Sequence, residues 1–178
     1  GGNALVVDAG AGPFVNDAGP EALQVSGKGR WLVFAGSPFS DTIGGLPFDF
    51  KQYGTTARSE QPIRGAGNGL LYALQPELSA TLVNVSKVYD GTAAAVFSPA
   101  NLPVSGAIDG DQIQLAATGA YTTAGLTPVT PGRPADAGSG KRVDADATIL
   151  SASTSGEQGA VPVYGYVLAT PKLSSDSG

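Results

Sequence analysis

Residues 79–98, SATLVNVSKVYDGTAAAVFS, decide the fold class that the sequence predicts. Apolar and polar residues alternate up to Tyr89, which is the pattern of a strand with one buried face. The Asp90-Gly91 pair then supplies the backbone freedom of a tight turn, with a positive φ expected at the glycine. Small residues follow, and 93–98 is predicted to be the returning strand. Tyr89, Asp90 and Gly91 are therefore interpreted as a structural turn motif, with Tyr89 packed inward.

The composition of the whole chain favours the same class. The 178 residues include 26 Gly and 13 Pro, and both residue types are unfavourable inside helices. Apolar residues nevertheless make up 42% of the chain, which is too many for a disordered linker. Short strands joined by many turns satisfy both observations, so an all-β fold is predicted.

Charge and residue usage exclude several functions. The net charge of −5 leaves no basic patch for nucleic acid or for an anionic membrane. No apolar run approaches the roughly 18 residues of a spanning helix, so direct membrane insertion is not expected. The chain has no Cys and no His, which removes disulfides, thiolate nucleophiles, the common zinc ligands and the usual general base. We predict no enzyme activity, no cofactor and no metal site.

The remaining segments predict two regions. Short apolar runs at 4–7, 14–15 and 22–25 suit the rungs at the end of a parallel β-helix, and 30–78 is expected to add two or three antiparallel strands. Alternation over 112–122, over 141–150 and again over 161–171 predicts three further strands, with a Pro-rich loop before the second of them. The expected organisation is a β-helix end and connecting β segment (1–80), a small β-sandwich-like module (81–172) and a frayed tail (173–178).

Two pairs of acidic residues are candidates for a calcium site or a catalytic site. Asp109 and Asp111 flank a glycine, which favours a turn over a calcium loop because the twelve-residue calcium pattern is missing. Asp144 and Asp146 share one face of a strand, where solvent exposure is expected and a carboxylate-dependent hydrolase or self-processing activity is the least favoured hypothesis. The single Trp, Trp31, is interpreted as a core residue.

Several segments together resemble filamentous-haemagglutinin-like exoproteins of bacterial two-partner secretion. FVNDAGPEALQVSGKGRWLVFAGSPFSDTIGGL at 14–46 is similar to the segment that follows their β-helical repeats, and SKVYDGTAAA resembles the opening of their YDG-type module. GDQIQLAATGAY, GSGKRV and VYGYVLA resemble the middle and end of that module, with Gly165-Tyr166 in place of the family's Asn-Tyr pair. The family-motif positions singled out are Arg30, Trp31, Gly44 and Gly45, at which turn and core roles are implied.

The resemblance implies a structural or adhesive fragment of a large secreted or surface-attached adhesin, acting as a spacer or display module. It implies a host or bacterial surface glycan or protein receptor as partner, and an outer-membrane secretion partner for the parent protein. The alternative is a carbohydrate-binding module that recognises glycans through loop Tyr, Asp and Asn residues. The sequence leaves open the ligand, calcium binding, the oligomeric state, and whether a Lys–Asn isopeptide crosslink replaces the missing disulfides.

Overall fold

The computed structural model describes residues 2–88, 90–122, 141–155 and 159–176. These residues contain eleven strands and two short 3₁₀ helices, η1 (Pro38–Ser40) and η2 (Pro99–Asn101), so the all-β prediction is confirmed. The chain divides into two compact units whose segments interleave along the sequence. The first unit is Gly1–Glu77, Ala107–Ile113 and Ser151–Val167, and the second is Leu78–Gly106, Gln114–Leu150 and Leu168–Gly178.

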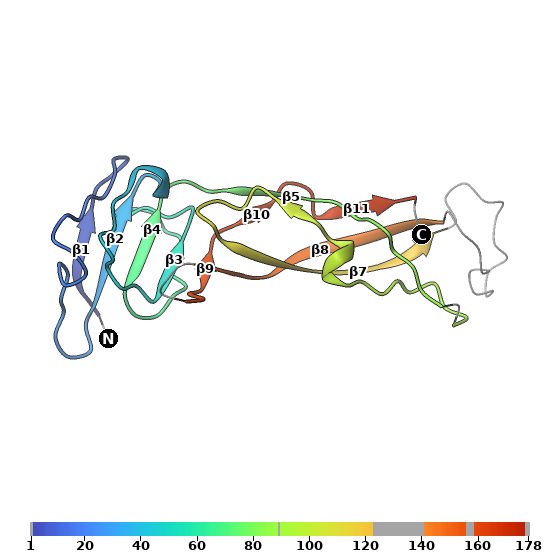
Figure 1. The fold of residues 1–178 in the computed structure, drawn as a ribbon, viewed down its shortest axis with the longest axis horizontal. Coiled ribbons are helices and arrows are strands. Elements are labelled where there is room, and N and C mark those ends of the chain that lie inside the picture. The colour runs from blue at the N-terminus through green and yellow to red at the C-terminus, as the bar shows by residue number, and fades with distance from the viewer. Residues whose placement is uncertain (1, 89, 123–140, 156–158, 177–178) are drawn as a thin grey trace. The chain divides into compact units, whose positions relative to one another are not determined.

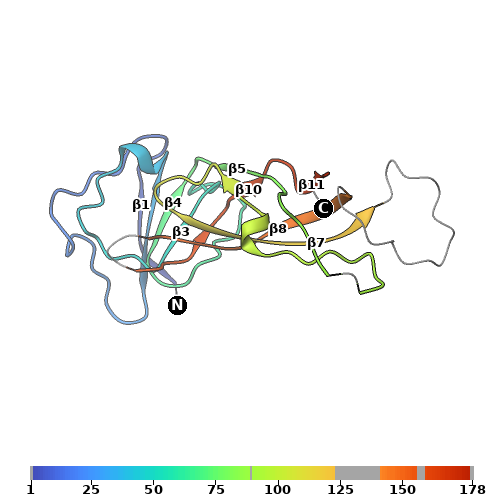
Figure 2. The same ribbon diagram turned by 45° about the vertical axis from the view of Figure 1, so that its right-hand side comes forward.

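A five-stranded sheet forms the first unit. Its spatial order is β1 (Asn3–Asp8), β2 (Arg30–Ala35), β4 (Gly69–Tyr72), β3 (Phe50–Gln52) and β9 (Val163–Tyr164), which can be followed in Figure 1. Figure 2 shows β1, β4 and β3 of this sheet in a turned view. Each strand pairs with its neighbours in parallel. The expectation of antiparallel strands over 30–78 is therefore wrong.

The burial of this sheet agrees with its parallel pairing. The strands β2 and β4 are buried along almost their whole length, and their sequences RWLVFA and GLLY are nearly continuous apolar runs. Such runs are typical of strands that are covered on both faces, as parallel strands usually are. Trp31 is fully buried, as expected of a core residue.

The first unit also contains parallel pairing outside its five-stranded sheet. Val15 and Thr42 form an isolated parallel bridge, as successive turns of a coil would. The buried Asn16 beside this bridge donates to the carbonyl oxygens of Gly19 and Ile43 at 2.8 and 3.0 Å. The coil is not a simple one, however, because β4 lies between β2 and β3 in the sheet although it follows β3 in the sequence.

The hydrophobic core of this sheet depends on two glycines that face one ring. Phe50 packs with Leu32, Phe34 and Leu71, and a Cβ atom added at Gly65 or at Gly69 would overlap its ring. Neither glycine has the left-handed φ that disfavours other residues. The requirement for glycine is therefore one of space, which allows the ring and the backbone of β4 to pack closely.

We expect Gly69→Ala to lower the free energy of unfolding by about 1–3 kcal/mol, because the added methyl group forces the Phe50 ring or the β4 backbone to move. Chemical denaturation measures this loss. Gly2→Ala is the matched control, since nothing lies within 4 Å of a Cβ atom there. Combining Gly69→Ala with Phe50→Leu should cost less than the sum of the two single changes, and strict additivity would contradict the proposed overlap.

The remaining strands form two three-stranded sheets. One has the order β10 (Val167–Leu168), β5 (Glu77–Ala80) and β6 (Val104–Ser105), and the other β11 (Lys172–Ser175), β8 (Arg142–Ser153) and β7 (Gln112–Thr122). The predicted strands at 112–122 and 141–150 correspond to β7 and β8. Along β8 the side chains of Val143, Ala145 and Ala147 are buried, as the alternation in the sequence predicted.

Residues 79–98 fold differently from the prediction. Regular strand structure ends at Ala80, and residues 81–88 form no strand. Asn84 has a φ of +50°, which interrupts the extended backbone, so the buried side chains are Leu82 and Val85, three residues apart. The predicted returning strand at 93–98 contributes one isolated antiparallel bridge, between Ala94 and Ala120.

Candidate functional site

The first unit contains a buried lysine inside its parallel sheet. Lys51 is the middle residue of β3, between Phe50 and Gln52, and 2% of its side chain is exposed. Its Nζ lies 2.7 Å from Asp109 Oδ2 and 2.6 Å from Asp111 Oδ1. We call Lys51, Tyr53, Asp109, Asp111 and Tyr166 the Lys51 cluster.

The Asp111 carboxylate is the centre of this cluster, and its side chain is 0% exposed. Oδ1 accepts from Lys51, while Oδ2 accepts from the hydroxyl groups of Tyr53 at 2.9 Å and Tyr166 at 2.8 Å. Three donors therefore replace the water that the carboxylate loses on burial, as a buried charge requires.

A tight turn places both carboxylates at the lysine. Asp109 and Gly110 have φ values of +53° and +71°, and the Asp111 amide donates to the Ile108 carbonyl at 3.0 Å. Positive φ at both central residues is the geometry of a type I′ turn, for which Asp-Gly is a favoured sequence. The turn interpretation of IDGD is thus confirmed, and the turn serves to present the two acids to Lys51.

Tyrosine rings pack around this site within the first unit, with Tyr72 stacked on Tyr53 and Tyr166 edge-on to it. The Tyr53 ring lies 5.7 Å from Tyr72 and 5.1 Å from Tyr166, and Lys51 Nζ lies 5.4 Å from the Tyr53 ring centre. Burial raises the pKa of Tyr53 far above its ordinary value, and the negative charge of Asp111 adds to the rise. Burial likewise raises the pKa of Tyr72 and the pKa of Tyr166. The three phenols thus remain neutral, as hydrogen-bond donors must.

The predicted turn motif is partly described. Tyr89 lies outside the described residues, so its expected inward packing stays a prediction. Gly91 has a φ of +78°, and the Asp90 Oδ1 atom accepts from the Thr92 amide at 2.9 Å and from Lys87 Nζ at 2.7 Å. The Asp90 side chain is exposed, and these bonds close a local loop rather than line a cavity.

We expect the loop around Asp90 to open in acid. The hydrogen bond from Lys87, followed by those from Thr92, lowers the pKa of Asp90 to about 2. Because the folded pKa is below the unfolded value of about 4, the carboxylate stabilises the loop above that value and loses this effect as the pH falls through about 2. A carboxyl-carbon NMR titration measures the midpoint, which Lys87→Met should raise. A wild-type midpoint near 4 would show that the loop is not formed in solution.

The family-motif positions have structural roles in the first unit. Arg30 donates through an NH1 atom to the Gly65 carbonyl at 2.9 Å, and Trp31 is buried in β2. Gly44 and Gly45 have φ values of +59° and +73°, and a Cβ atom at Gly44 would overlap the Asn16 carbonyl oxygen. These contacts are those of turn and core residues.

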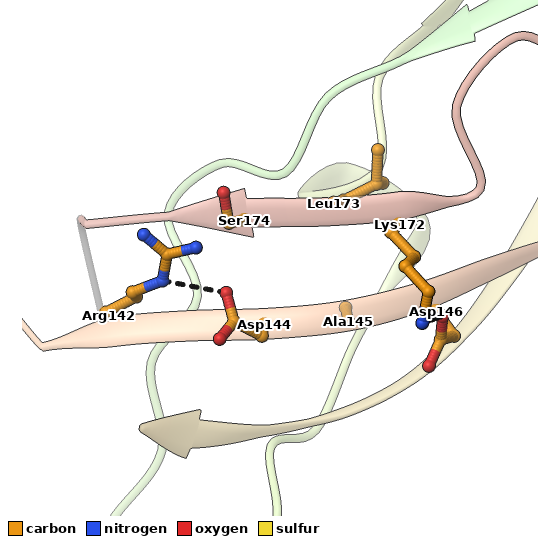
Figure 3. A pocket seen from close by; sticks show the side chains of 7 residues that line it. All are labelled: Arg142, Asp144, Ala145, Asp146, Lys172, Leu173 and Ser174. Carbon is orange, nitrogen blue, oxygen red and sulfur yellow. Dashed lines mark hydrogen bonds and ion pairs between the residues drawn. The ribbon is translucent and has the colours of Figure 1, made fainter. Parts of the chain in front are cut away.

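A groove of about 410 Å³ in the second unit is lined by residues of the paired strands β8 and β11 (Figure 3). It contains the two acidic residues considered as a hydrolase pair. Asp144 accepts from Arg142 Nε at 2.8 Å, and Asp146 accepts from Lys172 Nζ at 3.2 Å. Each carboxylate therefore has its own cation, and among the residues that line the groove there is no aromatic ring. In the described part of the chain, no group of three or more His, Cys, Asp or Glu side chains is arranged to hold a metal ion.

Comparison with known proteins gives one match. Residues 74–160 match the family model of the YDG domain. The chain therefore contains a YDG domain. No curated protein and no solved structure matches the chain. Asp109 and Asp111 lie within the matched YDG residues, whereas Lys51 precedes them by more than twenty positions.

The Lys51 cluster was not predicted from the sequence. Lys51 lies in the segment FDFKQY, where a lysine between aromatic residues suggests an exposed position on a short strand. Its partner Asp111 is 60 residues away in the sequence. The available signal was a lysine within a buried strand together with an Asp-Gly-Asp turn elsewhere in the chain. A buried lysine requires an acid partner, and the turn offers two.

Proposed function

We propose that this chain is a structural segment of a large secreted bacterial surface adhesin, in which it acts as a spacer or display module. The observation that carries the proposal is the YDG domain at residues 74–160, in a chain whose first unit contains a sheet of parallel strands. The similarity of 14–46 to the segment after the β-helical repeats of filamentous-haemagglutinin-like exoproteins adds to it. The proposal assigns a receptor-facing or linking role, and no catalysis.

The parallel pairing in the first unit supports a place within an elongated coil. β1 and β2 pair in parallel, and Val15 and Thr42 form a parallel bridge in the run that follows. Among the described strands β1 has a neighbour on one side, so its other edge carries backbone groups that a further parallel strand can pair with. In the proposed parent protein, an adjacent coil would meet this edge. Within the described residues no helix is long and apolar enough to cross a membrane.

Surface display tests the proposal. The chain is fused between an outer-surface anchor and a reporter domain in bacteria, and capture of the reporter's ligand by whole cells is measured. We expect capture with the native chain and with Gly2→Ala, and fewer displayed reporters with the core variant Gly69→Ala. Equal display with all three chains would indicate that the folded segment contributes nothing as a spacer.

Carbohydrate binding is the second candidate, and the groove lined by β8 and β11 favours it. Arg142, Asp144, Lys172 and Ser174 place charged and hydroxyl groups along one hollow, where they could bind sugar hydroxyls. Of the tyrosines, Tyr53, Tyr72 and Tyr166 are buried and are therefore unsuited to this role. Selective binding on a glycan array that Asp144→Asn abolishes would replace the pure spacer proposal by this one.

A further inference from the structure

The Lys51 cluster brings a buried amine and a buried carboxyl group together. Lys51 Nζ and Asp111 Oδ1 are 2.6 Å apart, and their side chains are 2% and 0% exposed. Burial of two full charges carries a large desolvation cost that their attraction need not repay. A reaction that removes both charges would eliminate this cost.

We propose that Lys51 and Asp111 condense to an intramolecular isopeptide bond, with Asp109 as the proton carrier. The bond would join β3 to the Ile108–Asp111 turn within the first unit. The two residues are 60 positions apart in a chain that has no cysteine, so the amide would close the kind of long loop that a disulfide closes elsewhere.

The reaction balances without a further reactant. A proton passes from the Lys51 ammonium group to the Asp111 carboxylate, which leaves a neutral amine beside a carboxylic acid. The nitrogen lone pair then attacks Cγ of Asp111, and the C=O electron pair moves onto Oδ2. Asp109 takes a second proton from the nitrogen and transfers it to Oδ1, which leaves as water when the C–O bond breaks. One C–N bond forms, and one water molecule is released.

The positions of the two tyrosines suit the tetrahedral step. Tyr53 and Tyr166 both donate to Asp111 Oδ2, the atom on which negative charge develops during the attack. Two fixed donors at that atom are the arrangement of an oxyanion hole. Well-oriented intramolecular reactions reach effective concentrations of about 10⁵–10⁸ M, and fixed contact between amine and acid opposes in the same way the unfavourable equilibrium of amide formation in bulk water.

Asp109 differs from Asp111 in the way that a proton carrier requires. Its Oδ2 lies 2.7 Å from Lys51 Nζ, yet its side chain is 45% exposed. It can therefore exchange protons with solvent while it contacts the reacting nitrogen. The positive φ values of Asp109 and Gly110 hold it in this position.

The other lysine–aspartate pairs of the described residues provide controls. Lys87 with Asp90 and Lys172 with Asp146 are joined at 2.7 and 3.2 Å, but both aspartates are exposed. Among the described residues, no tyrosine hydroxyl donates to either carboxylate. We expect no condensation at these two pairs, because water competes with the amine and solvates the charged forms.

Intact-mass spectrometry of the unfolded 178-residue chain tests the proposal. We expect the native chain to weigh about 18 Da less than its sequence, the mass of one water. Lys51→Arg should restore the full mass while it retains a buried cation, and Lys172→Arg should keep the loss. A native chain at its full sequence mass would overturn the proposal without recourse to any variant.

Variants of the two acids test the chemistry. Asp111→Asn keeps a carbonyl group at the reacting position, so it should lose ammonia, about 17 Da, and give the same amide. Asp109→Asn removes the proton carrier and should reduce the crosslinked fraction at least tenfold after equal incubation. Unchanged condensation in Asp109→Asn would exclude the role given to that residue.

Peptide mapping separates the proposed bond from a cyclised Asp-Gly sequence, which also loses one water. The isopeptide requires a branched peptide that contains both Lys51 and Asp111, and it survives mild alkali. A loss of mass that persists in Lys51→Arg, or that maps to Asp90-Gly91 or Asp109-Gly110 alone, would overturn the proposal.

Discussion

Replacing Lys51 with methionine is expected to lower the free energy of unfolding by about 3–5 kcal/mol. The substitution keeps much of the side-chain volume but removes the cation between Asp109 and Asp111. The Asp111 carboxylate then stays buried, with two tyrosine hydroxyls as its remaining donors and a second carboxylate nearby. If the proposed amide forms in the native chain, its loss adds to this value. Urea or guanidinium denaturation of the two chains measures the difference.

Lys172→Met is the matched control for this prediction. It removes the same residue type from another lysine–aspartate pair, but the Lys172 side chain is 83% exposed. Exposed pairs contribute less than about 1 kcal/mol, since both charges remain solvated when they separate. Similar losses in Lys51→Met and Lys172→Met would mean that the Lys51 cluster is open to water in solution.

Alternation and strand propensity predicted two strands and one buried side chain correctly. The alternation of Val143, Ala145 and Ala147 with polar residues predicted β8, because a strand with one buried face has a period of two. The strand at 112–122 was predicted with the bounds that β7 has in the structure. Burial of Trp31 followed from an apolar run with high strand propensity.

Long-range pairing could not be read from the sequence in the same way. The apolar runs at β2 and β4 indicate strands but do not state whether their neighbours are parallel, and antiparallel pairing was the wrong choice. Alternation up to residue 88 predicted a strand that Asn84 interrupts with a positive φ, a conformation that asparagine tolerates better than most residues. Period and propensity alone do not report such a backbone change.

The candidate site was hidden for a related reason. A lysine in a short strand and an aspartate in a turn each have an ordinary structural interpretation, and for the aspartates the turn was the one predicted. Only the return of residues 107–113 to the first unit brings Asp111 onto Lys51. The site is therefore a product of the interleaved chain path and not of any one motif.

Alkaline unfolding is expected to begin near pH 10 and to steepen above it. Burial is the first cause of the raised pKa of Tyr53, of Tyr72 and of Tyr166. Because each folded pKa lies above the unfolded value of about 10, the stability that each neutral phenol contributes is complete below pH 10 and is lost as the pH rises toward the folded value. Each tyrosine contributes a slope of about 1.4 kcal/mol per pH unit in that range, and the three together contribute about 4 kcal/mol per pH unit.

Denaturant titrations at a series of pH values measure this slope, and tyrosinate absorbance reports ionisation in the same samples. At least three of the six tyrosines should remain neutral until the chain unfolds. Tyr72→Phe is the informative variant, because Tyr72 stacks on Tyr53 but donates no hydrogen bond to Asp111. It should reduce the slope by about 1.4 kcal/mol per pH unit and leave the Lys51 cluster in place. Ionisation of all six tyrosines before unfolding would contradict the buried positions of these rings, and with them the dry environment on which the chemistry of the Lys51 cluster depends.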